Sequence, residues 1–377
     1  MKNQVFNYNL KDSQATVVKP LSVKKFDIER YNEYEARVEE KCKKFWNSNS
    51  GVLVYRRMRV AEVFSTDCGD IKKSLEWQLG GLNKSMEYKT DIPNFIEPWY
   101  GIGTVASSFG FDYYWADGQA PAVNGKFNST AEALNIDVTP VKNTKIGQHT
   151  IKMLEYFIHE TKGKIPLSYC DVQSPLNVAG NIIDINNFLT GFYMDTSGII
   201  KILDIIADLI IEFTNEQTKL LGDVLVKPGH GFASCRKFEG FGMSDDNMVM
   251  LPDDLYREMV LPSFIKVGEA LGGPVLHSCG NWLDKIDIIK KIPNLKMVDA
   301  AFSSQTDPDP NPPEYFAEGF CNTGIVLNAR IVGNMEVIEE KVKKLWKPGM
   351  KLIVVTYCQS FEEQEKAYNL IHSICNS

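Results

Sequence analysis

A regular alternation of helical and strand-like segments after residue 146 limits the fold of this chain more than any other feature. Apolar residues recur at helical spacing over 147–162, 197–221, 252–271, 281–291 and 334–346. Short apolar runs typical of buried strands lie at 165–170, 223–226, 274–276, 297–301, 325–328 and 352–357. Nearly continuous apolar strands that alternate with helices predict a parallel sheet covered on both faces.

The number and spacing of these segments favour one α/β domain, a closed (β/α)8 TIM barrel, over an open doubly wound sheet. Before the regular part, 27–48 and 71–89 show helical periodicity, and 52–55 suits a short buried strand. Residues 95–145 have no clean period, and we expect irregular loops with a few short strands there. We therefore predict an N-terminal helical extension over 1–50, packed on a barrel formed by 51–377.

Composition excludes several classes of protein. The 377 residues carry a net charge of −7 and are 44% apolar, which is ordinary for a globular enzyme and unsuited to binding nucleic acid. No run reaches the roughly 20 apolar residues of a membrane span, and the first residues do not resemble a signal peptide. We expect a cytoplasmic protein that binds neither membrane nor nucleic acid, with its eight cysteines reduced.

His277 and Cys279 lie two residues apart at the end of an apolar run, and Cys358 lies at the end of another. Alternate side chains of an extended segment point to the same side, so His277 and Cys279 can bind one ion. One imidazole and two thiolates with an open fourth position are typical of catalytic zinc. The competing interpretation is a hydrogen-bonded loop histidine and two small buried cysteines.

Other polar residues follow strand-like segments and are expected at the same end of the barrel. Asp245 and Asp246 are candidates for orienting His277 or gripping a substrate, although the same residues suit the start of a helix. His230, between Gly229 and Gly231, is a candidate catalytic residue or an ordinary loop histidine.

Three further polar residues, Asp171, Gln173 and Asn177, follow the run 165–170. They are candidate substrate-binding residues, and the first two could instead satisfy loop backbone. The segment 307–313 (DPDPNPP) is predicted to be a stiff surface loop.

The segments 244–252 (SDDNMVMLP), 256–262 (YREMVLP) and 275–281 (VLHSCGN) resemble the uroporphyrinogen decarboxylase family. The resemblance implies a single-domain (β/α)8 barrel. Within that family, H-x-C followed by a distant cysteine marks zinc-dependent methyltransferases that pass a methyl group from a methylated corrinoid to a thiol. It therefore implies zinc held by His277, Cys279 and Cys358, with a small thiol as substrate.

The resemblance also implies a corrinoid (methylcobalamin) as methyl donor. The chain has no D-x-H-x-x-G sequence of the kind that holds cobalamin, so the corrinoid is expected to be loosely bound or brought by a separate corrinoid protein. A homodimer is left open.

Two other functions compete with this prediction. A metal-free carboxy-lyase, acting on a porphyrinogen or another polycarboxylate, would need arginines at the barrel mouth. The segment 55–59 (YRRMR) does not match the family's R-Q-A-G-R-Y segment, but this hypothesis predicts that Arg56, Arg57 or Arg59 points into the mouth. A binding protein with a structural zinc would instead close the site with a fourth protein ligand.

Overall fold

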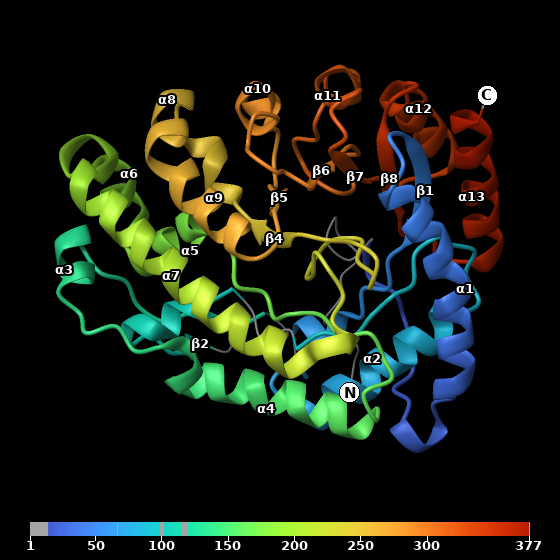
Figure 1. The fold of residues 1–377 in the computed structure, drawn as a ribbon, viewed down its shortest axis with the longest axis horizontal. Helices are drawn as coiled ribbons and strands as arrows, with labels where there is room; N and C mark the ends of the chain where they lie inside the picture. Colours follow the sequence, from blue (N-terminus) through green and yellow to red (C-terminus); the bar gives the residue numbers. More distant parts are fainter. Residues whose placement is uncertain (1–13, 66, 99–101, 115–119, 377) are drawn as a thin grey trace.

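The computed structural model describes residues 14–65, 67–98, 102–114 and 120–376. Its centre is a parallel sheet in the order β1-β8-β7-β6-β5-β4, whose strands lie side by side in Figure 1. The six strands are β1 (Gly51–Arg56), β4 (Phe241–Ser244), β5 (Pro274–His277), β6 (Met297–Ala301), β7 (Val326–Arg330) and β8 (Lys351–Thr356).

Backbone hydrogen bonds of three further segments close this sheet into a ring. The Asp91 amide donates to Val54 of β1, Ile96 bridges to Leu167, and Leu167 bridges to Leu225. The Gly242 amide of β4 then donates to Pro228. The predicted strands at 165–170 and 223–226 form isolated β-bridges instead of regular strands. Side chains take the place of some backbone partners there, and the Cys170 amide, for example, donates to Gln217 Oε1.

Helices cover the outside of the ring, on both sides of the row of strands in Figure 1. They are α1 (Ile28–Trp46), α2 (Ile71–Ser85), α4 (Lys145–Glu160), α5 (Pro175–Ile182), α6 (Ile185–Met194), α7 (Thr196–Leu221), α8 (Asp253–Leu255), α9 (Leu261–Ala270), α10 (Ile286–Ile289), α11 (Pro313–Phe320), α12 (Met335–Leu345) and α13 (Phe361–Cys375). The irregular part holds only β2 (Tyr113–Tyr114), β3 (Ala122–Val123), α3 (Thr130–Leu134) and short 3-10 turns among its described residues.

Local signals explain where several helices begin. Asp195 accepts from the Gly198 amide at the start of α7, and Ser360 and Glu363 form a reciprocal capping pair at the start of α13. Ser174 caps α5, with Pro175 in its first turn. The predicted helix 252–271 is interrupted by a wide turn over Tyr256–Val260, just before Pro262, which has no amide hydrogen to donate.

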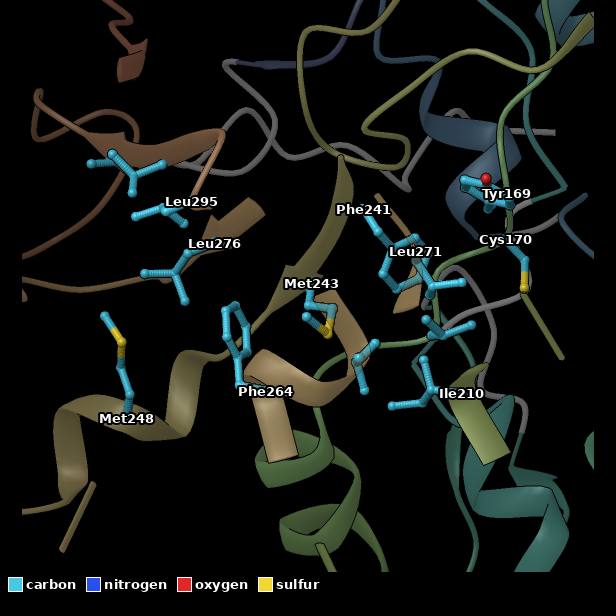
Figure 2. Packing of buried hydrophobic residues seen from close by; sticks show 14 of the residues in the cluster. Tyr169, Cys170, Ile210, Phe241, Met243, Met248, Phe264, Leu271, Leu276 and Leu295 are labelled. Carbon is cyan, nitrogen blue, oxygen red and sulfur yellow. The ribbon is translucent and has the colours of Figure 1, made fainter. Parts of the chain in front are cut away.

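Alternate residues of each strand face opposite layers of the core. Val275, Met297 and Val326 belong to an inner cluster that also includes Cys42 and Phe45 near the end of α1. Leu276, Val298 and Leu327 belong to the outer cluster beneath the helices. Figure 2 shows part of this outer layer, with Phe264 of α9 facing Met243 of β4 and Leu276 of β5.

This alternation decides which strand residues reach the barrel mouth. Two residues beyond Val275, Met297 and Val326 are His277, Asp299 and Asn328. The sheet register pairs Asp299 with His277 on one side and with Asn328 on the other. Polar side chains therefore follow the apolar layer toward the carboxyl ends of the strands. None of the described helices is long and apolar enough to cross a bilayer.

Candidate metal centre

Three side chains that can bind a metal converge at this end of the barrel. One ligand atom each from Asp246, His277 and Cys279 lies within 4.8 Å of the others. The Cys279 sulfur is 3.4 Å from His277 Nε2, and Asp246 Oδ1 is 3.5 Å from the same nitrogen. Among the described residues, no other three His, Cys, Asp or Glu side chains form such a group.

The other ring nitrogen of His277 is held by a buried carboxylate. His277 Nδ1 lies 2.5 Å from Asp299 Oδ2, which directs Nε2 toward Cys279 and Asp246. A carboxylate behind a metal-binding histidine fixes the orientation of the ring and makes it a stronger ligand. Asp299, and not Asp245 or Asp246, therefore orients His277.

Electrostatics at His277 follow from these contacts. Burial alone would lower its pKa, but the negative charges of Cys279 and Asp299 outweigh burial and raise the pKa to about 10. Burial would raise the pKa of Asp299, yet Arg330 and His277 outweigh it and lower that pKa. Arg330 Nε lies 2.9 Å from Asp299 Oδ2, so the buried carboxylate is compensated by two cations.

A polar network holds Asp246 in place. Its Oδ1 accepts from the Cys279 amide at 2.7 Å, and its Oδ2 accepts from Asn177 Nδ2 at 3.0 Å. Asn177 Nδ2 also donates to Gln173 Oε1, and Gln173 in turn donates to Asp171. The three predicted substrate-binding residues thus form a chain leading to Asp246, and Asp171 and Gln173 also line the pocket described below.

The loop after Cys279 is held by the segment predicted to be a surface loop. Asp307 accepts from the Gly280 amide at 2.8 Å, and Asn311 accepts from the Trp282 amide at 2.9 Å. Asp307 and Asn311 are buried, while Pro308 and Asp309 between them are exposed. The segment 307–313 is therefore a surface loop that also supports the H-x-C loop. Gly280 has φ +75°, a conformation that favours glycine at this turn.

Cys358 is not a member of this group among the described residues, so its place in the predicted ligand set stays a prediction. Its carbonyl accepts from Arg56 Nε at 2.7 Å, and the residue lines a separate cavity with Tyr357 and Glu363. Burial raises the pKa of the Cys358 thiol to about 11, although Arg56 opposes the shift.

Asp245 also lies apart from the three ligand candidates. Its carboxylate is fully buried and accepts from Ser174 Oγ at 2.6 Å and from Tyr256 Oη at 2.7 Å. Burial raises its pKa to about 6. These contacts link the end of β4 to α5 and to the wide turn before α9, which is a structural task.

A cavity of about 400 Å³ opens in front of the candidate ligands. This is within the size range of small-molecule pockets. Its lining is rich in charged side chains: Arg57, Arg59, Asp171, His230, Asp246, His277, Cys279, Asp299 and Arg330, with Phe64, Ile102, Ala120, Gln173, Gly231 and Ser244. Arg56 is absent from this lining, since it is fully buried against Cys358 and Thr16.

The sequence contained signals for the residues that its interpretation missed. Asp299 and Arg330 are charged residues within apolar strands, where charges are rare unless they are paired or functional. Glu97, which contacts His230 Nδ1 at 2.6 Å, stands in an irregular segment that has no such pattern.

Comparison with known proteins supports the family expectation. Residues 87–229 match the family model described as uroporphyrinogen decarboxylase (URO-D). The family resemblance is therefore confirmed, although the matched part precedes the 244–281 region in which the resemblance was seen. No curated protein matches the chain.

A solved structure of a methyltransferase from Methanosarcina mazei has a similar fold. The two chains superpose with a TM-score of 0.57 at 12% sequence identity, and the likeness covers 98% of this chain and 100% of the other. At this identity the likeness shows the fold, and it confirms the predicted α/β barrel class.

Proposed function

We propose that this chain, part of which matches the uroporphyrinogen decarboxylase family model, is a zinc-dependent methyltransferase. In this proposal it transfers a methyl group from a methylated corrinoid, brought by a separate protein, to a small thiol. The convergence of Asp246, His277 and Cys279 within 4.8 Å at the carboxyl ends of the strands carries the proposal.

The donor set fits a catalytic zinc ion. An imidazole nitrogen, a thiolate and a carboxylate oxygen are all zinc ligands, and three protein ligands leave a position for substrate. The His277 ring is already oriented by Asp299, as expected for a metal-binding histidine. When bound, zinc would keep a substrate thiol deprotonated, and the thiolate is the nucleophilic form.

The residues of the chain have distinct tasks in this proposal. His277, Cys279 and Asp246 hold the ion, while Asn177 and the Cys279 amide fix the Asp246 carboxylate. Arg330 balances Asp299, so that the buried carboxylate can hold His277 Nδ1 without being protonated.

The name of the similar Methanosarcina protein adds support of a weaker kind. That protein is a methyltransferase, and the two chains share a fold over nearly their whole length. A shared barrel does not by itself imply a shared reaction, so the argument rests on the site.

Methyl transfer from methylcobalamin to 3-mercaptopropionate by the zinc-loaded protein tests the proposal. Loss of the methyl group changes the visible spectrum of the cobalamin, and the methyl thioether is identified by mass spectrometry. We expect transfer that requires zinc and is lost in Cys279→Ser but retained in Cys321→Ser, a cysteine outside the pocket lining. Absence of transfer by protein with stoichiometric zinc, or equal rates in the two variants, would contradict it.

One observation favours the carboxy-lyase as a second candidate. Arg57 and Arg59, which follow β1, line the same pocket as Arg330. Arginines at such a position suit substrate carboxylates. Decarboxylation of a polycarboxylate by metal-free protein, reduced in Arg59→Gln, would establish this function in place of methyl transfer.

A further inference from the structure

A second histidine–carboxylate pair lines the same pocket as the candidate metal ligands. His230 Nδ1 lies 2.6 Å from Glu97 Oε2, and their side chains are 18% and 10% exposed. His230 lines the cavity together with His277 and Cys279. The metal-site proposal gives this pair no task.

The backbone around the pair is firmly held. Gln78 Nε2 donates to the Glu97 carbonyl at 2.9 Å, and Gln78 Oε1 accepts from the Glu97 amide at 2.7 Å. On the other side, Ser234 Oγ accepts from the Gly229 amide at 3.0 Å. Gly229 and Gly231 have φ +115° and +84°, so the turn that presents His230 needs glycine on both sides.

The carboxylates around His230 stabilise the imidazolium that forms when it accepts a proton. Burial would lower its pKa, but the carboxylates of Glu97 and Asp171 outweigh both burial and the repulsion from Arg57, and the pKa is raised. The phenyl ring of Phe64 is a further neighbour, with its centroid 6.0 Å from the imidazole centroid. A raised pKa makes the neutral imidazole a stronger proton acceptor.

We propose that His230 accepts the proton that the thiol substrate loses when its sulfur binds the metal centre, and that Glu97 is the residue that positions His230. This inference rests on the proposed methyl transfer and names the proton acceptor of that reaction. His230 enters the step as a neutral imidazole whose Nδ1–H donates to Glu97. The S–H bond then breaks with its electron pair left on sulfur, and an N–H bond forms at His230 Nε2. Glu97 balances the imidazolium, which later returns the proton to solvent.

Proton release on thiol binding tests the acceptor. The zinc-loaded full chain is titrated with 3-mercaptopropionate by calorimetry between pH 6 and 9, in buffers with different heats of ionisation. We expect wild type and His159→Gln, which changes an exposed histidine on α4, to release fewer protons to the buffer than His230→Gln. In His230→Gln the whole thiol proton should reach the buffer.

Equal proton release by wild type and His230→Gln, with thiol bound to both, would overturn the inference and leave the proposed function standing. Failure of zinc-loaded wild type to bind any thiol would instead overturn the proposed function, and the inference with it.

The role of Glu97 has a readout that does not depend on activity. The Cε1 proton of His230, followed by NMR, should titrate at lower pH in Glu97→Gln than in wild type, because a charge that favours imidazolium has been removed. In the transfer assay, His230→Gln should be slower by about 100-fold, the usual contribution of a general base.

In Glu97→Gln, the loss of transfer rate at acidic pH should move to lower pH, following the histidine. A purely structural role of Glu97 would lower the rate equally at every pH and leave the titration of His230 unchanged, and that result would overturn the pairing.

Discussion

The identity of the third metal ligand gives the sharpest test of the site. The structure groups Asp246 with His277 and Cys279, and it places Cys358 at a separate cavity. The perturbations are Asp246→Asn, Cys279→Ser and Cys358→Ser, with Cys321→Ser as a control for replacing a cysteine outside the pocket. Asparagine keeps the size of the Asp246 side chain and one oxygen that can accept from the Cys279 amide.

The expected magnitude follows from the number of ligands. Zinc sites with four protein ligands bind with about 10–16 kcal/mol, or about 3 kcal/mol for each ligand. Loss of Cys279 or Asp246 should therefore weaken zinc binding by about 100-fold, since 1.4 kcal/mol is about tenfold. Cys358→Ser and Cys321→Ser should change the affinity by less than about threefold, because neither sulfur belongs to the group.

Competition with a chromogenic zinc chelator under reducing conditions measures these affinities. Cobalt substitution adds a second readout, since the near-ultraviolet sulfur-to-cobalt absorption grows with the number of thiolate ligands. We expect the absorption of one thiolate, lost in Cys279→Ser and retained in Cys358→Ser. If Cys358→Ser weakens zinc as much as Cys279→Ser while Asp246→Asn has no effect, the ligand set argued from the structure is refuted.

Three other predictions concern the surroundings of the site. Asp299→Asn should weaken zinc binding by about 10- to 100-fold. It should also destabilise the fold by about 3–5 kcal/mol, because Arg330 is left buried without its partner. In urea unfolding, the double variant Asp299→Asn/Arg330→Met should regain stability without regaining zinc affinity, and recovery of both would contradict the role of Asp299. Burial raises the pKa of Asp245 to about 6, so this carboxyl holds its proton more tightly in the folded chain than in the unfolded chain. The free energy of unfolding should therefore fall by about 3 kcal/mol as the pH rises from about 4 through 6. Asp245→Asn should remove this pH-dependent loss of stability, and the same difference in unfolding free energy between pH 4.5 and pH 7.5 in wild type and variant would argue against it. Phe264 lies in the outer core between α9 and the sheet. Phe264→Ala should lower the free energy of unfolding by about 3–5 kcal/mol without changing zinc affinity. A loss below about 1 kcal/mol would show that this layer is loosely packed.

The sequence by itself determined the fold class and half of the site. Periodicity is a local property, and it located the strands 274–277, 297–301, 326–330 and 351–356 to within a few residues. The sequence analysis did not predict helices such as α5, α11 and α13. Their apolar periodicity is weak, because the helices are short or rich in polar residues, and their start signals lie in segments with a loop-like composition. His277 and Cys279 could be paired because two residues in an extended segment share one side.

Only the tertiary structure decided what completes the site. Asp299 meets His277 because the parallel register aligns β5 with β6, and Asp246 meets Cys279 because the loop after β4 folds over the end of β5. Cys358 follows β8, which β7 and β6 separate from β5. Its carbonyl accepts from Arg56 at the end of β1, and the residue lines another cavity. Register and loop packing depend on contacts between residues that are distant in the chain, and local spacing carries no information about them.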